Sequence, residues 1–169
     1  MHALEKIMAE ADGFLLIGHS GEGRFPGLSY HAYTTAGRRF YCLDMGGLTE
    51  SRGSSAGGPV YTRVEDLPPD HDDLAIIWVK PHTATAAVEL AAAAGCERVW
   101  FSFKTGHRDA ITRAAELGLE VVEVGRCPVY YLEGAPMACR LHTNMTRLSG
   151  TRRRPPQLEP DPSRRRELL

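Results

Sequence analysis

The chain has no apolar run long enough to cross a membrane. Its most apolar stretches, 13–17 and 74–79, are far shorter than the roughly 20 residues that span a bilayer. The first twelve residues carry acidic side chains and no long apolar core, unlike a secretory signal. We therefore expect a cytoplasmic protein with no membrane partner.

The chain also lacks a strong net charge. Its formal charge of -1 gives no overall basic field of the kind that draws proteins to nucleic acids. Before position 151 the basic residues form no stripe, and the later arginines are interrupted by proline and acid. We therefore expect no nucleic acid partner, and any anion site must be local.

Patterns typical of metal sites and of catalysis are missing as well. The four cysteines show no Cys-x-x-Cys spacing and lie in or beside apolar segments, which is typical of reduced thiols. The seven histidines are scattered and form no pair at metal-ligand spacing. We expect no metal, no disulfide and no catalytic residues, although the sequence alone leaves enzymatic activity open.

Short apolar runs alternate with helix-like segments along most of the chain. The runs expected to be strands are 13–18, 39–43, 73–79, 98–103 and 119–124. Segments 81–95 and 107–118 have helical spacing and end at glycine. The alternation implies right-handed β-α-β crossovers. It predicts an α/β, Rossmann-like, doubly wound three-layer fold with a mostly parallel sheet of five to six strands.

The composition changes near position 150. The preceding residues suffice for one buried core, so we expect a single domain over 1–150. Residues 151–169 are charge-dense and broken by proline, which predicts a disordered tail. The apolar side chains of segment 134–148 fall on one helical face, which we expect to cover the sheet or a second subunit in a homodimer. They are Met137, Leu141, Met145 and Leu148.

A glycine-rich turn after the first expected strand is the strongest local signal. It runs from Gly18 to Arg24, and a helix is expected from about residue 28. Glycine lets the backbone approach a pyrophosphate, and a helix N-terminus favours negative charge. A turn that needs glycine only for backbone reasons is the alternative. We interpret the turn as a phosphate site whose candidate contacts are Gly18, His19, Ser20, Gly21, Gly23 and Arg24.

Open parallel sheets bind ligands beyond the carboxyl ends of their strands. Three further strand ends therefore belong to the candidate site, and they contribute Asp44, Met45, Lys80, Pro81, Lys104, Thr105 and Gly106. Asp44 follows Gly18 by 26 residues, where a dinucleotide fold places the acid that binds the ribose hydroxyls, and this favours NAD. Coenzyme A carries a 3'-phosphate, which Asp44 would repel unless Arg38, Arg39 or Lys80 compensates. A solvated or turn-capping aspartate is the remaining alternative.

Several short motifs occur together in the order found in a known family. The chain resembles the small stand-alone CoA-binding proteins, which are related to the N-terminal domain of the succinyl-CoA synthetase alpha subunit. The resemblance rests on Gly18-His19-Ser20, on Arg24 and Ser29-Tyr30, on Lys80-Pro81, and on Gly125-Arg126-Cys127-Pro128. After the second expected strand the chain has Cys-Leu-Asp-Met at 42–45 where the family has Pro-Val-Asn-Pro.

The resemblance implies a binding mode for coenzyme A. The phosphates would lie over Gly18 to Arg24, with Ser29 among the contacts, and the adenine between the ends of the second and fourth strands. The pantetheine arm would lie near Lys104 to Gly106. The implied role is a carrier, sensor or accessory module without independent catalysis, because the catalytic parts of the synthetase are lacking. An NAD-binding redox sensor or small oxidoreductase and a ligand-free interaction module are the alternatives.

Overall fold

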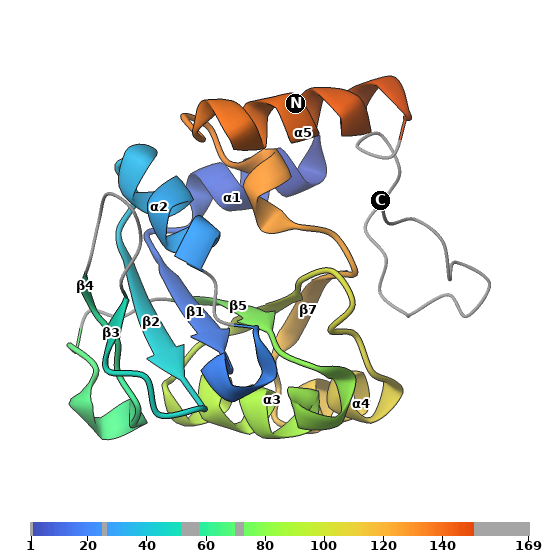
Figure 1. Cartoon of the computed structure of the whole chain (residues 1–169). Coiled ribbons are helices and arrows are strands. Elements are labelled where there is room, and N and C mark those ends of the chain that lie inside the picture. The colour runs from blue at the N-terminus through green and yellow to red at the C-terminus, as the bar shows by residue number, and fades with distance from the viewer. Residues whose placement is uncertain (1, 25–26, 52–57, 70–72, 151–169) are drawn as a thin grey trace.

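The computed structural model describes residues 2–24, 27–51, 58–69 and 73–150 (Figure 1). Its centre is a five-stranded, all-parallel sheet in the order β2-β1-β5-β6-β7. The strands are β1 (Phe14–Gly18), β2 (Phe40–Asp44), β5 (Leu74–Trp78), β6 (Arg98–Phe101) and β7 (Glu120–Val124). The predicted Rossmann-like parallel sheet is confirmed, and each strand lies within its expected run or extends one residue beyond it.

Helices cover both faces of this sheet (Figure 1). One face carries α3 (Ala84–Ala93) and α4 (Arg108–Glu116), and the other carries α1 (Ala3–Glu10), α2 (Gly27–Thr35) and α5 (Met137–Leu148). Four short 3-10 helices join these elements, namely η1 (Ser20–Glu22), η2 (Val64–Asp66), η3 (Pro81–Thr83) and η4 (Pro128–Tyr131). The predicted three-layer arrangement is therefore confirmed.

Alternating side chains of the central strand divide the core between the two faces. Leu15 and Ile17 are fully buried on the side of α3, whose small alanines let the helix approach the sheet closely. Phe14 and Leu16 are buried on the opposite side with Leu4 of α1. Burial of both faces explains why β1 is apolar at every position except its terminal glycine.

The glycine- and serine-rich segment after β2 contains two short strands. β3 (Glu50–Ser51) and β4 (Gly58–Pro59) pair antiparallel. Tyr61 then lies beside β2, because its N–H donates to the Cys42 carbonyl and its carbonyl accepts from the Asp44 N–H, both at 2.8 Å. This contact holds the chain beside the end of β2, where the candidate site begins.

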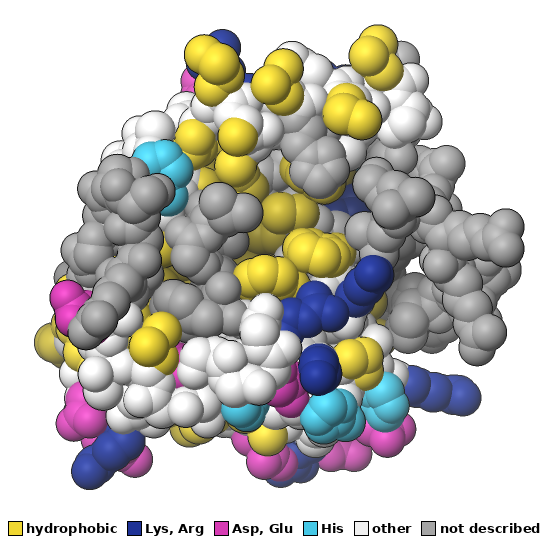
Figure 2. Space-filling view, viewed as in Figure 1, with side chains coloured by type: hydrophobic (Ala, Val, Ile, Leu, Met, Phe, Trp, Pro, Cys, Tyr) yellow, Lys and Arg dark blue, Asp and Glu magenta, His cyan; other side chains and the backbone are white. Residues whose placement is uncertain are grey.

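Helix α5 packs on η4 and leaves its apolar face exposed. The side chains of that face are 62–89% exposed and protrude along the top of the molecule in Figure 2. They therefore do not cover the sheet, and a covering second subunit stays a prediction. The domain boundary at 150 also stays a prediction, since residues 151–169 lie outside the described ranges. None of the described helices is both long and apolar enough to cross a membrane.

Candidate ligand-binding site

The carboxyl ends of three neighbouring strands define the candidate site. In the sheet register Gly18 of β1 lies between Asp44 of β2 and Trp78 of β5. From β1 the chain proceeds to β2 on one side and later to β5 on the other. This reversal is the topological switch point at which open α/β sheets bind ligands.

The glycine turn forms a compact loop beyond β1. His19 and Arg24 form an antiparallel bridge, in which the Arg24 N–H donates to the His19 carbonyl at 3.0 Å. The one-turn helix η1 lies between them and ends at Gly23, whose φ of 67° is in the left-handed region that favours glycine. Helix α2 then begins at Gly27, close to the expected start at residue 28. The loop thus precedes a helix, as the phosphate-site prediction requires.

Asp44 fastens one side of this loop. One carboxylate oxygen accepts from the Ser20 N–H and the other from the Ser20 hydroxyl, each at 2.6 Å. The second oxygen also accepts from the Leu48 N–H at 2.7 Å. Because Asp44 is only 1% exposed, both oxygens are used inside the protein. The side chain acts as a cap for the loop and the following turn.

Gly46 lets the turn after β2 lie directly against the loop. A Cβ atom at this position would fall 2.4 Å from the Ser20 hydroxyl and 2.7 Å from the Gly21 backbone nitrogen. Nonbonded atoms do not approach so closely. The close approach, rather than an unusual backbone angle, is what requires glycine at position 46.

Glu22 fastens the opposite side of the loop to the turn after β5. Its carboxylate accepts from the Lys80 N–H at 2.8 Å and from the Thr83 hydroxyl, and it lies 3.0 Å from His82 Nε2. Burial by itself raises the pKa of Glu22. The bonds from Thr83 and Lys80 and the charges of His19 and His82 outweigh it, so the pKa lies below its usual value. Glu22 therefore stays ionised and holds the loop at neutral pH.

Arg24 turns back over two aromatic rings at the ends of β5 and β6. Its guanidinium carbon lies 5.6 Å from the centre of the Trp78 ring and 5.8 Å from that of Phe103. Both distances are in the range of cation–π contacts. The Trp78 indole nitrogen is buried and has no hydrogen-bond partner among the described residues. Figure 2 shows Lys and Arg side chains beside hydrophobic ones near the centre of this face. These contacts hold the positively charged Arg24 guanidinium in place against the two aromatic rings.

The turn after β6 completes the edge. Lys104 has a φ of 57°, the only left-handed value among the described non-glycine residues, and its side chain is exposed. Thr105 is fully buried, and its N–H donates to the Ser102 carbonyl at 3.2 Å. Gly106 is partly exposed. The turn thus holds Lys104 in an uncommon conformation with its ammonium group in solvent.

The structure joins most of the predicted site residues. Ser20 donates to Asp44, and the Met45 N–H donates to the Gly18 carbonyl at 2.9 Å. His19, Gly23 and Arg24 are bonded within the loop, and Lys80 contacts the loop through Glu22. Pro81 follows Lys80 at the start of η3, and the Lys104–Gly106 turn follows Phe103, whose ring Arg24 contacts. The Ser29 side chain lies outside the described residues.

Some residues of the site were missed by sequence reasoning. They are Glu22, Gly46, Trp78 and Phe103. Glu22 lies within the predicted turn, and Trp78 and Phe103 lie at predicted strand ends. Their location in these segments is the one feature of the sequence that could have identified them. Their partners are distant in sequence, and no local pattern identifies them.

Two further side chains with titratable groups are His19, in the loop, and Cys127, which follows β7. His19 Nδ1 is buried without a hydrogen-bond partner among the described residues, and its ring packs near Gly21. Burial raises the pKa of the Cys127 thiol to about 12, so it stays protonated at neutral pH. The described residues contain no group of three or more side chains that could hold a metal ion.

Comparison with known families decides what kind of domain carries this site. Residues 30–132, more than half of the chain, match a family described as a CoA binding domain. The chain belongs to the CoA-binding domain family. The matched region of this CoA-binding domain begins after the glycine loop and includes the ends of β2, β5, β6 and β7. The predicted family is therefore confirmed.

Solved structures share this fold. A hypothetical protein from Pyrococcus horikoshii OT3 has 26% identity and a TM-score of 0.63, over 76% of this chain and 86% of that one. The dinucleotide-forming acetyl-coenzyme A synthetase 1 of Ca. Korarchaeum cryptofilum has 18% identity and a TM-score of 0.53. That match covers 78% of this chain but only 31% of the synthetase and shows the fold alone. A search of curated proteins found no match.

Proposed function

We propose that this protein binds coenzyme A at the carboxyl edge of β1, β2, β5 and β6 and serves as a carrier, sensor or accessory module. The family match over residues 30–132 carries the proposal. The proposed contacts are those of the predicted site other than Asp44, whose carboxylate is bonded to Ser20 and Leu48. The phosphates would lie over the loop Gly18–Arg24 and the pantetheine arm near Lys104–Gly106.

The loop geometry suits a phosphate ligand. Asp44 and Glu22 fasten the loop from two sides, so little order need be gained when a ligand binds. Three cationic side chains, Arg24, Lys80 and Lys104, stand at the neighbouring strand ends. A pyrophosphate and a 3'-phosphate require positive charge at separate points, and this distribution supplies it.

The surroundings of Asp44 favour coenzyme A over NAD. A ribose-binding carboxylate needs a free oxygen directed at the ligand. Both Asp44 oxygens accept from Ser20 or Leu48, and the residue is almost fully buried. Binding a ribose would require breaking these bonds. The same bonds spread the Asp44 charge over backbone and hydroxyl donors and so weaken its repulsion of a 3'-phosphate.

The proposed absence of catalysis rests on how the polar groups of the loop are used. The Ser20 hydroxyl donates to Asp44 rather than to His19. His19 Nδ1 has no hydrogen-bond partner among the described residues. These three side chains therefore do not form the nucleophile, base and orienting acid of a catalytic triad.

Calorimetric titration with coenzyme A, dephospho-CoA and NAD in parallel tests the proposal, after native mass spectrometry has checked for a copurified ligand. We expect coenzyme A to bind more tightly than dephospho-CoA, because a cation reads the 3'-phosphate. Binding of NAD alone would support the redox alternative. No binding of any of the three would favour a ligand-free interaction module.

We also propose that the exposed face of α5 supports a homodimer. Single exposed apolar residues are normal on a protein surface, but four large apolar side chains on one helix face form a continuous patch, which is typical of an interaction surface. Light scattering of the full chain should give twice the mass of one chain, and Leu141→Glu should lower it to that of a monomer. A wild-type monomer at tens of micromolar would exclude the dimer at working concentrations.

A further inference from the structure

A cavity lies on the face of the sheet that carries α1 and α5. It has a volume of about 620 Å³ and opens between α1, η4 and α5. None of the residues proposed to bind coenzyme A lines it. Its size is that of sites for small organic ligands, which range from roughly 300 to 1,000 Å³. Helix α5 packs mainly on η4, and the cavity lies beside this contact.

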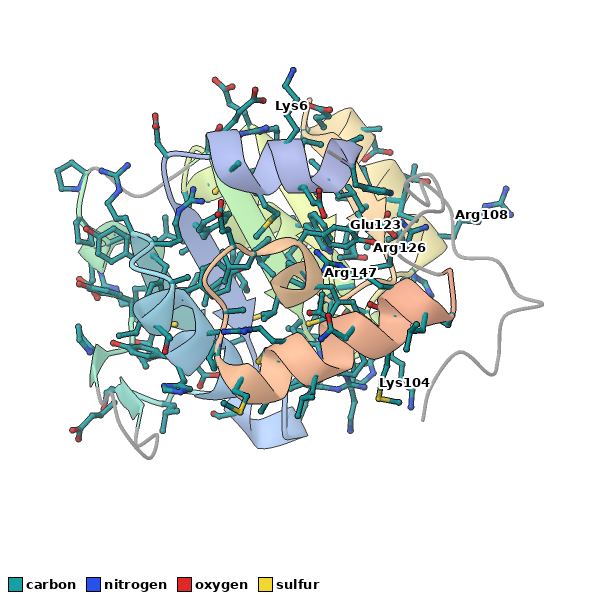
Figure 3. The ribbon with its side chains drawn as sticks, turned by 90° about the horizontal axis from the view of Figure 1, so that it is seen from above. Lys6, Lys104, Arg108, Glu123, Arg126 and Arg147 are labelled. Atoms are coloured by element: carbon teal, nitrogen blue, oxygen red, sulfur yellow. The ribbon has the colours of Figure 1, made fainter. Side chains whose placement is uncertain are left out.

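A row of three donor side chains on α5 borders the cavity. Arg140, Asn144 and Arg147 stand at positions i, i+4 and i+7 and all line it. This spacing places them on one helix face, next to the exposed apolar face. Figure 3 shows Arg147 on the side of α5 that faces α1, whereas Lys104 lies on the other side of the helix. The row is thus directed at the cavity and not at the proposed coenzyme A site.

The two arginines have no partner within the described part of the chain. Neither the Arg140 nor the Arg147 guanidinium forms a hydrogen bond or an ion pair there, whereas the guanidinium of Arg113 in α4 pairs with Glu89 and Glu116. Seven residues of helix separate the two arginines by about 10 Å along the axis. Each guanidinium presents a fork of donors that matches a carboxylate or a phosphate.

The other charges at the cavity are mostly occupied. Arg38 donates to the carbonyls of Met8, at 2.8 Å, and of Ala11. Glu5 accepts from the His2 N–H at 3.0 Å. Glu133 lies exposed on the lining and is the one carboxylate without a partner among the described residues there. Free positive charge therefore exceeds free negative charge at this surface.

Apolar and aromatic atoms make up much of the remaining lining. Met8 and Ala9 contribute from α1, and Tyr130 and Leu132 from η4 and the residue after it. Such a surface suits the organic body of a ligand, while the arginines suit its charged ends.

We propose that this cavity binds an organic anion carrying two phosphate or carboxylate groups, held between Arg140 and Arg147. The ligand is separate from coenzyme A, and the inference does not depend on the proposed function. Nucleoside diphosphates and small polycarboxylates both have this chemistry. Asn144, between the arginines, donates from its amide to the same ligand.

Calorimetric titration of the full chain with ADP, citrate and inorganic pyrophosphate tests this site, at low ionic strength and with coenzyme A present so that ADP does not report on the proposed coenzyme A site. The double variant Arg140→Gln/Arg147→Gln is compared with Arg63→Gln/Arg113→Gln, which removes the same charge elsewhere on the surface. We expect Arg140→Gln/Arg147→Gln to weaken binding at least tenfold and Arg63→Gln/Arg113→Gln to change it less than twofold. Glu133→Gln should strengthen binding severalfold, since it removes the nearby negative charge.

The probes distinguish the two ligand sources. Tighter binding of ADP indicates a nucleotide, and tighter binding of citrate indicates a polycarboxylate. The proposal is overturned if none of the probes binds, if only pyrophosphate binds, or if both double variants weaken binding equally. It is also overturned if coenzyme A displaces the arginine-dependent probe by binding in its place. Both arginine side chains are exposed, so the double variant should melt at the wild-type temperature.

Discussion

The backbone N–H and the hydroxyl of Ser20 both donate to the Asp44 carboxylate, each across 2.6 Å. The two residues stand at the ends of adjacent parallel strands. Their contact joins the glycine loop to the end of β2, and the ionised carboxylate makes both bonds charge-assisted. The Asp44 side chain therefore holds one side of the loop in place, and with it any ligand bound over the loop.

Asp44→Asn should destabilise the fold and weaken coenzyme A binding. The amide keeps only one acceptor oxygen and cannot replace the bonds from Ser20 and Leu48. We expect the free energy of unfolding to fall by about 1 to 3 kcal/mol, the cost of unsatisfied buried groups. Urea unfolding and calorimetry measure the two effects. Asp66→Asn, which makes the same change at a largely exposed side chain, should alter neither.

Gly46→Ala should displace the loop. The added methyl group would overlap Ser20 and Gly21, and we expect a loss of about 1 to 3 kcal/mol in unfolding free energy together with weaker coenzyme A binding. Gly37→Ala is the matched control, because Gly37 has a φ of +64° but open space around its Cα. That variant should cost about 1 kcal/mol of stability and leave the affinity unchanged. Equal affinity losses in both would show that position 46 acts only through stability.

Glu22 should make stability depend on pH below neutrality. Its pKa is lowered in the folded state, so the folded protein binds this proton more weakly than the unfolded chain. The stabilisation is fully present above the unfolded glutamate pKa of about 4.3 and is lost as the pH falls through the folded value. Unfolding of wild type and Glu22→Gln should therefore differ at about pH 7 and converge near pH 3.

An exposed glutamate provides the control for that experiment. Glu120→Gln, at the start of β7, should follow the wild-type pH profile. A constant difference between wild type and Glu22→Gln across the whole range would mean that the Glu22 charge does not hold the loop.

Arg24→Ala should weaken coenzyme A binding by about 1 to 3 kcal/mol, as expected for the loss of a charged hydrogen bond to phosphate. Arg24→Lys keeps the charge but loses the guanidinium that lies over the Trp78 and Phe103 rings, so its affinity should be intermediate. Calorimetry checks the order of the three proteins. Unchanged affinity in Arg24→Ala would remove the residue from the site, and Arg63→Ala controls for the loss of surface charge.

The strands could be predicted because parallel strands are buried on both faces. Their positions appear as short apolar runs, such as the run that forms β1. The edge at which we propose that the ligand binds followed from topology, since parallel strands end at a common edge. The long-range hydrogen bonds that hold the glycine loop in place could not be predicted from the sequence. The Glu22 carboxylate and the Lys80 N–H are separated by 58 residues, and only the folded sheet brings them together.

Helix α5 also has one property that the local sequence predicted and another that only the packed structure shows. Its spacing correctly predicted that Met137, Leu141, Met145 and Leu148 share one face, because helical periodicity is a local property. Its spacing did not reveal that this face points outward while Arg140 and Arg147 border a cavity.

The sequence by itself determined the succession of strands and helices along the chain, the glycine turn and the family, because apolar periodicity and short motifs are properties of neighbouring residues. Only the tertiary structure decided that Asp44 caps the loop, that the Arg24 guanidinium lies over two aromatic rings and that α5 borders a cavity. These features depend on contacts between residues far apart in the chain, whose distances are set when the strands and helices pack.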